Sequence, residues 1–180
     1  MIDSRTFRNV LGRFATGVCV VAIAVEESVH AMTANAVCAL SLNPPQVLFC
    51  PNKLGRLAQL LAQAERFSVS FLREDQQALS TYFAGAWKEP QPPPFRFVQD
   101  LGAPRLEGSL AALVCDKQGL HDGGDHLLVI GRVVALHEGL EPHYPLLFFK
   151  GKYQNMERTG GKEAPLLADV TEEPPTVYYH

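Results

Sequence analysis

An unbroken apolar run at residues 18–25 constrains the fold more than any other feature of this sequence. The run is rich in valine, which favours β-strands. It is far shorter than the roughly 20 residues that a membrane-spanning helix requires. Because the run presents no polar face, it predicts a strand that is buried on both sides inside the domain.

Turn residues divide much of the remaining chain into further short strands. Residues 67–72 alternate apolar residues with serine, as a half-buried strand does. Residues 29–40 predict a partly irregular strand, and the two glycines at the centre of residues 119–125 predict a hairpin turn. In chain order, the strands predicted after the first cover residues 29–40, 46–50, 67–72, 109–117, 126–137 and 145–153.

Helical patterns are inserted between these strands. Asp3 or Ser4 can cap a first helix, and residues 55–64 and 74–83 have the pattern of two more. Residues 85–108 are rich in proline and glycine, and they are too long for a simple connection, so they predict a lid or a binding loop. The first helix has apolar side chains at spacings of three and four, namely Phe7, Val10, Leu11 and Phe14.

Many strands joined by tight turns, with helices inserted rather than alternating, predict a mainly β protein built as an antiparallel barrel. The length fits a single domain, which we expect to span residues 1–156. Residues 157–180 lose periodicity and gain glycine, proline and glutamate. They predict a C-terminal arm that is either disordered or laid on a partner subunit.

Composition narrows the class of protein. Lys plus Arg number 16 against 19 Asp plus Glu, and no basic stripe appears, so nucleic acid is a poor candidate partner. Polar residues stand at the N-terminus where a signal peptide needs its apolar segment, and we expect a cytoplasmic protein that does not enter a membrane. Reduced cysteines are favoured over disulfides or zinc, because no CxxC pair occurs among Cys19, Cys38, Cys50 and Cys115.

Common cofactor and catalytic signatures are absent from the sequence. There is no GxGxxG after a predicted strand and no GxxxxGK[ST] loop for phosphate. Ser41 lacks the glycines of a nucleophile elbow. If a cofactor binds, it therefore binds by another route.

Several short motifs occur in one order between residues 7 and 153. RFATGV is followed by MTAN, by SLNPP, by FAG, by GDH and finally by LFFKGKY. In this order the chain resembles the flavin reductase family. The resemblance implies an FMN-binding split β-barrel, a homodimer with flavin at the subunit interface, and service to a monooxygenase in a two-component system.

The resemblance also implies where a flavin would bind. The small, irregular segment of Thr33, Ala34, Asn35 and Ala36 would aim backbone N–H groups at the N5 and O4 edge of the flavin ring, where negative charge develops on reduction. The alternative for this segment is a plain turn between strands. Ser41 and Leu42 align near the pyrimidine end of the ring, and the ribityl chain would pass along Cys50, Asn52 and Lys53.

The expected phosphate position departs from the family pattern. Gly55 and Leu57 stand where many relatives have two hydroxyl side chains, Ala36 replaces a frequent serine, and Cys38 with Ala39 replaces a Thr-Ser pair. Hydrogen bonds to a charged acceptor are worth about 1.5–3 kcal/mol each. Lys53, Arg56 and the helix start at Gly55 can compensate, although Arg56 has the alternative of a solvated helix residue. The phosphate of FMN would be held differently or less tightly.

The turn that contains GDH predicts the nicotinamide side of the site. His126 could orient the nicotinamide amide or donate to reduced flavin, and its alternative is a structural histidine at the barrel mouth. The neighbouring His121, Asp122 and Asp125 fit a hairpin turn better than a metal site, and we expect no metal. Tyr153 would close over the flavin ring or pack at the barrel end.

These observations predict an enzyme that transfers a hydride from NADH or NADPH to FMN or FAD. Reduced flavin would then diffuse to a monooxygenase. The alternative is a split-barrel protein that binds flavin or another ligand without turnover.

Overall fold

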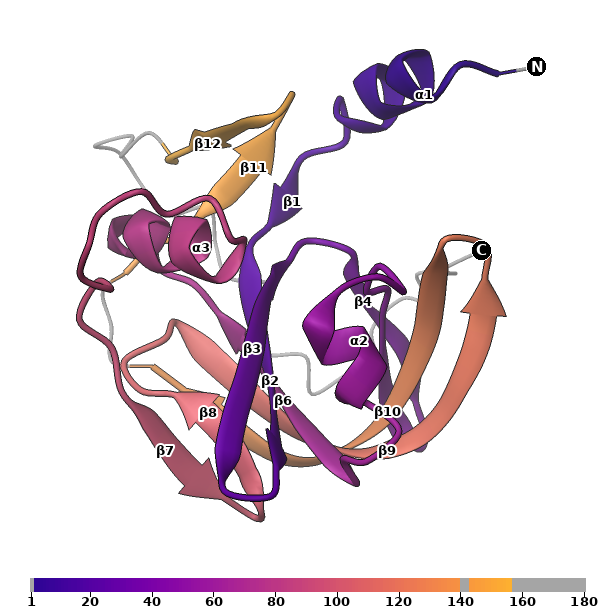
Figure 1. The fold of residues 1–180 in the computed structure, drawn as a ribbon, viewed down its shortest axis with the longest axis vertical. Coiled ribbons are helices and arrows are strands. Elements are labelled where there is room, and N and C mark those ends of the chain that lie inside the picture. Colours follow the sequence, from indigo (N-terminus) through magenta and orange to yellow (C-terminus); the bar gives the residue numbers. More distant parts are fainter. Residues whose placement is uncertain (1, 140–142, 157–180) are drawn as a thin grey trace, which may run out of the picture.

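The central sheet is antiparallel throughout and curves into a barrel (Figure 1). The computed structural model describes residues 2–139 and 143–156 of the chain. The predicted antiparallel β-barrel is confirmed. In their order across the sheet, the seven strands are β3 (Ser28–Ala34), β2 (Cys19–Val25), β6 (Arg66–Phe71), β9 (Ala111–Gly123), β10 (His126–Glu138), β5 (Pro45–Phe49) and β4 (Val37–Leu42).

Strand β2 is buried on both faces, as its sequence predicts. One face carries Cys19, Val21 and Ile23 into the core inside the barrel. The opposite face carries Val20 into a second core outside the sheet, where Val18 joins it. The apolar run therefore separates two cores that both depend on it.

Two smaller sheets cover parts of the barrel. A hairpin partly closes the second core and is hydrogen-bonded to the serines of β6. Ser68 Oγ donates to the Pro104 carbonyl at 2.5 Å, and the Leu106 N–H donates to Ser70 Oγ at 3.1 Å. The first small sheet contains β1 (Thr16–Gly17), β11 (Leu147–Phe149) and β12 (Lys152–Gln154), and the hairpin contains β7 (Phe97–Asp100) and β8 (Ala103–Leu106).

This hairpin corrects two predictions. Strand β6 is not half-buried, because the hairpin covers the face that carries Ser68 and Ser70, and both serines are buried. Residues 85–108 are not one lid or loop, since β7 and β8 form within them. The serine hydroxyl groups form hydrogen bonds with backbone groups of the covering hairpin. Serine on this face therefore indicates buried hydrogen bonds between the sheet and the hairpin rather than exposure to solvent.

The helices are short, and α2 packs its leucines into the core inside the barrel. Asp3 caps the first helix as predicted, because its carboxylate accepts a hydrogen bond from the Thr6 N–H at 2.8 Å. Within the described residues, none of the helices is long and apolar enough to cross a membrane. The helices are α1 (Ser4–Leu11), α2 (Arg56–Leu60), the 3₁₀ turn η1 (Glu74–Gln76) and α3 (Gln77–Phe83).

Three further predictions need correction. Residues 29–40 form two strands, since the chain leaves β3 at one sheet edge and enters β4 at the other. The hairpin turn at 119–125 is much smaller than predicted, because β9 continues to Gly123 and pairs with His126 of β10. Residues 145–153 contain the β11–β12 hairpin instead of one strand, with Lys150 and Gly151 at positive φ in the turn. The predicted tail, residues 157–180, lies outside the described residues.

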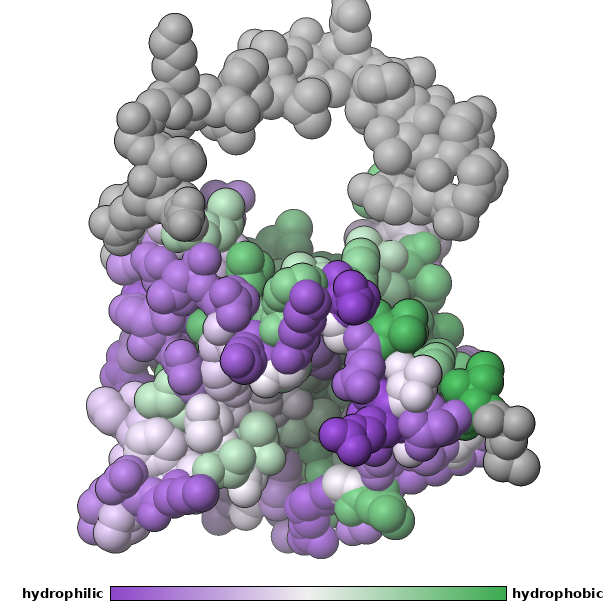
Figure 2. Space-filling model, turned by 90° about the horizontal axis from the view of Figure 1, so that it is seen from above, coloured by the Kyte–Doolittle hydropathy of each residue, from purple (hydrophilic) through white to green (hydrophobic). Residues whose placement is uncertain are grey.

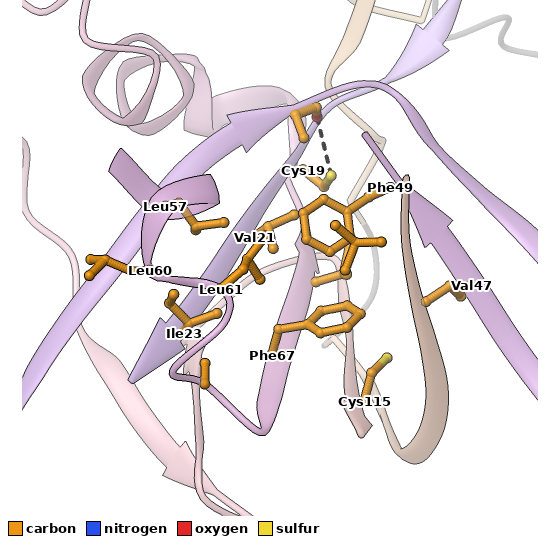
Figure 3. Close-up of a cluster of buried hydrophobic side chains, with 14 residues drawn as sticks. Cys19, Val21, Ile23, Val47, Phe49, Leu57, Leu60, Leu61, Phe67 and Cys115 are labelled. Atoms are coloured by element: carbon orange, nitrogen blue, oxygen red, sulfur yellow. Dashed lines mark hydrogen bonds between the residues drawn. The ribbon is translucent and has the colours of Figure 1, made fainter. Parts of the chain in front are cut away.

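The core inside the barrel packs around two aromatic rings (Figure 3). The ring centroids of Phe49 and Phe67 lie 4.9 Å apart. Cysteine thiols pack here as apolar groups, and burial raises the pKa of both Cys19 and Cys115 to about 12. All four cysteines are free thiols, as predicted.

Gly131 of β10 makes this packing possible and gives a first testable prediction. A Cβ atom at this position would overlap the Phe67 ring and lie 2.9 Å from the Cys115 Cβ. We expect Gly131→Ala to destabilise the fold by about 1–3 kcal/mol, the usual range for overpacking a core. Thermal unfolding followed by circular dichroism measures the change.

Gly17→Ala is the matched control, because no heavy atom outside its chain neighbours lies within 4 Å of a Cβ built there. A Gly131→Ala melting temperature equal to that of Gly17→Ala would contradict the packing argument.

Candidate functional site

Three segments that are distant in sequence meet at one end of the barrel. The Cys50 N–H donates to the Ala36 carbonyl at 3.1 Å, which joins the start of β4 to the end of β5. The Lys53 N–H donates to the Asp125 carbonyl at 3.0 Å, and Asn52 forms a β-bridge with His126. The structure therefore brings together the segments at residues 35–36, 50–53 and 125–126.

The corner between β3 and β4 exposes its backbone. Asn35 and Ala36 are both exposed. Among the described residues, no backbone carbonyl accepts a hydrogen bond from either of their N–H groups. Exposed amide donors without backbone partners fit the chemistry needed at the N5 and O4 edge of a flavin.

The other two residues of the predicted ring segment are tied into the fold. Thr33 Oγ1 donates to the Ser80 carbonyl at 2.6 Å. Ala34 is buried, and its carbonyl accepts a hydrogen bond from Cys19 Sγ at 3.1 Å, the dashed line in Figure 3. Thr33 and Ala34 thus hold the strand end in place, and Asn35 and Ala36 present the donors.

A tight turn follows Cys50 and leads into α2. Asn52 holds it with two hydrogen bonds, because its Oδ1 accepts from the Leu54 N–H and its carbonyl from the Gly55 N–H, both at 2.9 Å. Gly55 is the N-cap of a helix with five residues, and no side chain caps it. Cys50 is partly buried, which raises the pKa of its thiol.

The phosphate position lacks hydroxyl side chains in the structure as in the sequence. Leu57 is buried at 3% exposure in the core inside the barrel, so its side chain faces away from a ligand. Arg56 is exposed, and it lines a groove of about 460 Å³ between β3 and the helices α2 and α3. Aromatic side chains of Tyr82 and Phe95 form the far wall of this groove.

Lys53 is the half-buried cation of the site. Its Nζ lies 2.5 Å from Asp122 Oδ2 at the tip of β9. The hydrogen bond from Lys53 is the largest cause that lowers the pKa of the Asp122 carboxyl, and a bond from the Gly124 N–H adds to it. The lysine is therefore joined to the same hairpin that carries His126.

His126 has a defined orientation. Its Nδ1 lies 2.8 Å from Asp125 Oδ1. This bond, with the imidazole charge, holds the pKa of Asp125 below its usual range, so the carboxylate accepts and Nδ1 donates. In the described part of the chain, no group of three or more side chains is placed to hold a metal ion, and this includes the surroundings of His121 and His126.

Ser80 is a residue of this region that sequence reasoning missed. Its Oγ shares a hydrogen bond of 2.8 Å with the Tyr153 hydroxyl, and its carbonyl holds Thr33. The Tyr153 ring packs edge-on against Phe148, with the centroids 5.5 Å apart. Tyr153 therefore packs against the second core, and its closing over a flavin ring stays a prediction. A buried serine within α3 gives no sequence signal for the role of Ser80.

Ser41 and Leu42 lie away from the three joined segments. They pair with Gln46 and Pro45 at the turn end of the β4–β5 hairpin. Leu42 lies five positions along the strand from Val37, about 17 Å at the usual rise per residue. Leu42 is 87% exposed, so it is free to meet a second molecule.

Comparison with known proteins agrees with this geometry. Residues 11–157 match the model of the flavin reductase like domain. The reductase subunit HsaB of a flavin-dependent monooxygenase from Mycobacterium tuberculosis is 41% identical, over 87% of this chain and 84% of its own length. An NADH-dependent flavin reductase from Rhodococcus is 40% identical, over 87% of this chain and 88% of its own.

A solved structure supports the same assignment. The flavin reductase PheA2 superimposes with a TM-score of 0.81 at 36% identity, and the match covers 87% of this chain and all of that one. The barrel, the order of its motifs and these similarities agree over most of the chain. The chain belongs to the flavin reductase family.

Proposed function

We propose that this protein is an NAD(P)H:flavin oxidoreductase that transfers a hydride from a reduced nicotinamide to FMN or FAD. The observation that carries the proposal is the joining of the Asn35–Ala36 corner, Lys53 and His126 by backbone hydrogen bonds at one end of the barrel. The relatives named above as flavin reductases support it.

Each segment has a role that follows from its chemistry. Bound flavin supplies the hydride acceptor. The exposed N–H groups of Asn35 and Ala36 would stabilise the negative charge of the reduced ring, and Cys50, Asn52 and Lys53 would follow the ribityl chain. In the neutral ring, donation from Nδ1 of His126 to Asp125 leaves Nε2 to accept a hydrogen bond from the nicotinamide amide.

The finer assignments extend this proposal. NADH is the favoured donor, because relatives are named for it. Relatives are also named as reductase components of monooxygenases, which supports release of reduced flavin to such a partner. Free thiols at all four cysteines support a reducing, cytoplasmic location.

A homodimer is part of the proposal, and α1 supports it. The helix stands away from the barrel and buries none of its residues (Figure 1). Its apolar side chains are well exposed, with Phe7 at 55%, Val10 at 58% and Phe14 beyond the helix at 76%. Seen from above, apolar residues reach the surface in several patches (Figure 2). Exposed apolar surface of this kind usually marks an interface.

The activity itself is directly testable. We expect the purified protein to oxidise NADH when FMN, FAD or riboflavin is added, because the proposed ring contacts do not involve the phosphate. Absorbance at 340 nm with each flavin, for NADH and NADPH in parallel, measures this. Absence of turnover with every flavin would refute the reductase assignment.

His126→Asn tests the nicotinamide contact. We expect it to lower kcat/KM for NADH by about tenfold or more, the scale of one hydrogen bond to a substrate group, and to leave the flavin Kd unchanged. His121→Asn is the matched control, because His121 lies in the same hairpin opposite Leu128. Equal losses in the two variants would argue against a specific role for His126.

The double substitution Phe7→Glu with Val10→Glu tests the dimer. We expect it to shift the protein from dimer to monomer in sedimentation analysis at micromolar concentration, because it places two charges on the apolar face of α1. Asn9→Glu adds charge to the polar face of the same helix and should leave the dimer intact. A wild-type monomer would contradict this part of the proposal.

A further inference from the structure

The lysine that we expect to contact the flavin phosphate already has a partner in the protein. Lys53 Nζ forms the ion pair with Asp122 described above, and the Lys53 side chain is 33% exposed against 79% for Asp122. A second carboxylate is close, because the pKa of Asp125 is lowered first by His126 and also by the charge of Lys53. The ion pair itself is with Asp122.

We propose that Asp122 competes with the flavin phosphate for Lys53, and that this competition lowers the preference of the site for FMN over riboflavin. The inference rests on the proposed function and assigns Asp122 a role in flavin specificity. An FMN phosphate must displace a carboxylate to reach the ammonium group, whereas riboflavin has no phosphate and gains nothing from Lys53.

The surroundings leave few other groups for the phosphate. Gly55 has no side chain, and Leu57 points into the core. Lys53, which is paired with Asp122, and the exposed Arg56 therefore supply the positive charge that would favour a phosphorylated flavin. A partly exposed ion pair is weak, so a phosphate can displace Asp122, but at a loss of several-fold in affinity.

Two hydrogen bonds that involve main-chain groups hold Lys53 and Asp122 next to each other. Asp122 Oδ1 accepts a hydrogen bond from the Gly124 N–H at 3.0 Å, which fixes the carboxyl group over the turn. The Lys53 N–H donates to the Asp125 carbonyl at 3.0 Å, which holds the lysine beside the same turn. Both hydrogen bonds keep the two residues side by side at this turn.

Asp122→Asn is the decisive variant. Asparagine keeps the Oδ1 acceptor for Gly124 and removes the charge that pairs with Lys53. We expect the Kd for FMN to fall by about threefold to tenfold, as loss of one exposed competing charge allows, and the Kd for riboflavin to stay within about twofold. Quenching of flavin fluorescence during titration measures both constants.

Two further variants make the test specific. Asp75→Asn removes a carboxylate that is also exposed and paired, with Arg73 Nη2 at 2.9 Å, and it should change neither constant. In the background of Lys53→Met, Asp122→Asn should no longer improve FMN binding. A gain for FMN that persists without Lys53, or equal gains for both flavins, would overturn the inference.

Failure of this inference can be told apart from failure of the proposed function. If the wild-type protein binds neither riboflavin nor FMN, both fall. If it binds both and Asp122→Asn leaves the ratio of the two constants unchanged, only the role of Asp122 is refuted.

Discussion

Burial of β2 on both faces is the constraint on which the rest of the structure depends. One face supplies the core inside the barrel and the other supplies the second core beneath β8 and α3. Because β2 pairs with β3 along its whole length, it also sets where β3 ends. The Cys19 thiol fixes that end through the Ala34 carbonyl, one residue before the exposed corner. The position of the candidate ring contacts is therefore a consequence of core packing.

The crossing of the chain between β3 and β4 explains why the candidate site lies at this end of the barrel. The chain crosses from one edge of the sheet to the other between β3 and β4, and only Asn35 and Ala36 make the crossing. Residues in such a crossing have no neighbouring strand to satisfy their amides on both sides. The same end receives the tip of the β9–β10 hairpin, so donors, a cation and an imidazole meet at one edge.

Local features of this architecture could be predicted from the sequence, and long-range ones could not. The apolar run predicted β2, the Asp3 cap predicted α1, and the glycines predicted the β9–β10 turn, because each depends on neighbouring residues. The burial of Ser68 depends on a hairpin more than 25 residues away in a proline-rich segment, and its alternation with apolar residues suggested the opposite. The role of Ser80 and the Lys53–Asp122 pair depend likewise on strand register, which no local pattern encodes.

Burial of two cysteine thiols affects how well the protein resists oxidation. Reduced flavin reacts with oxygen to give hydrogen peroxide, so a reductase that releases reduced flavin is exposed to peroxide. Peroxide attacks thiolates, and burial raises the pKa of the Cys19 and Cys115 thiols to about 12, which keeps them protonated at neutral pH. Cys19, which anchors the ring corner, is thereby shielded from the by-product most able to damage it. Cys38 lies exposed on β4 outside both cores, so its oxidation would leave both cores intact.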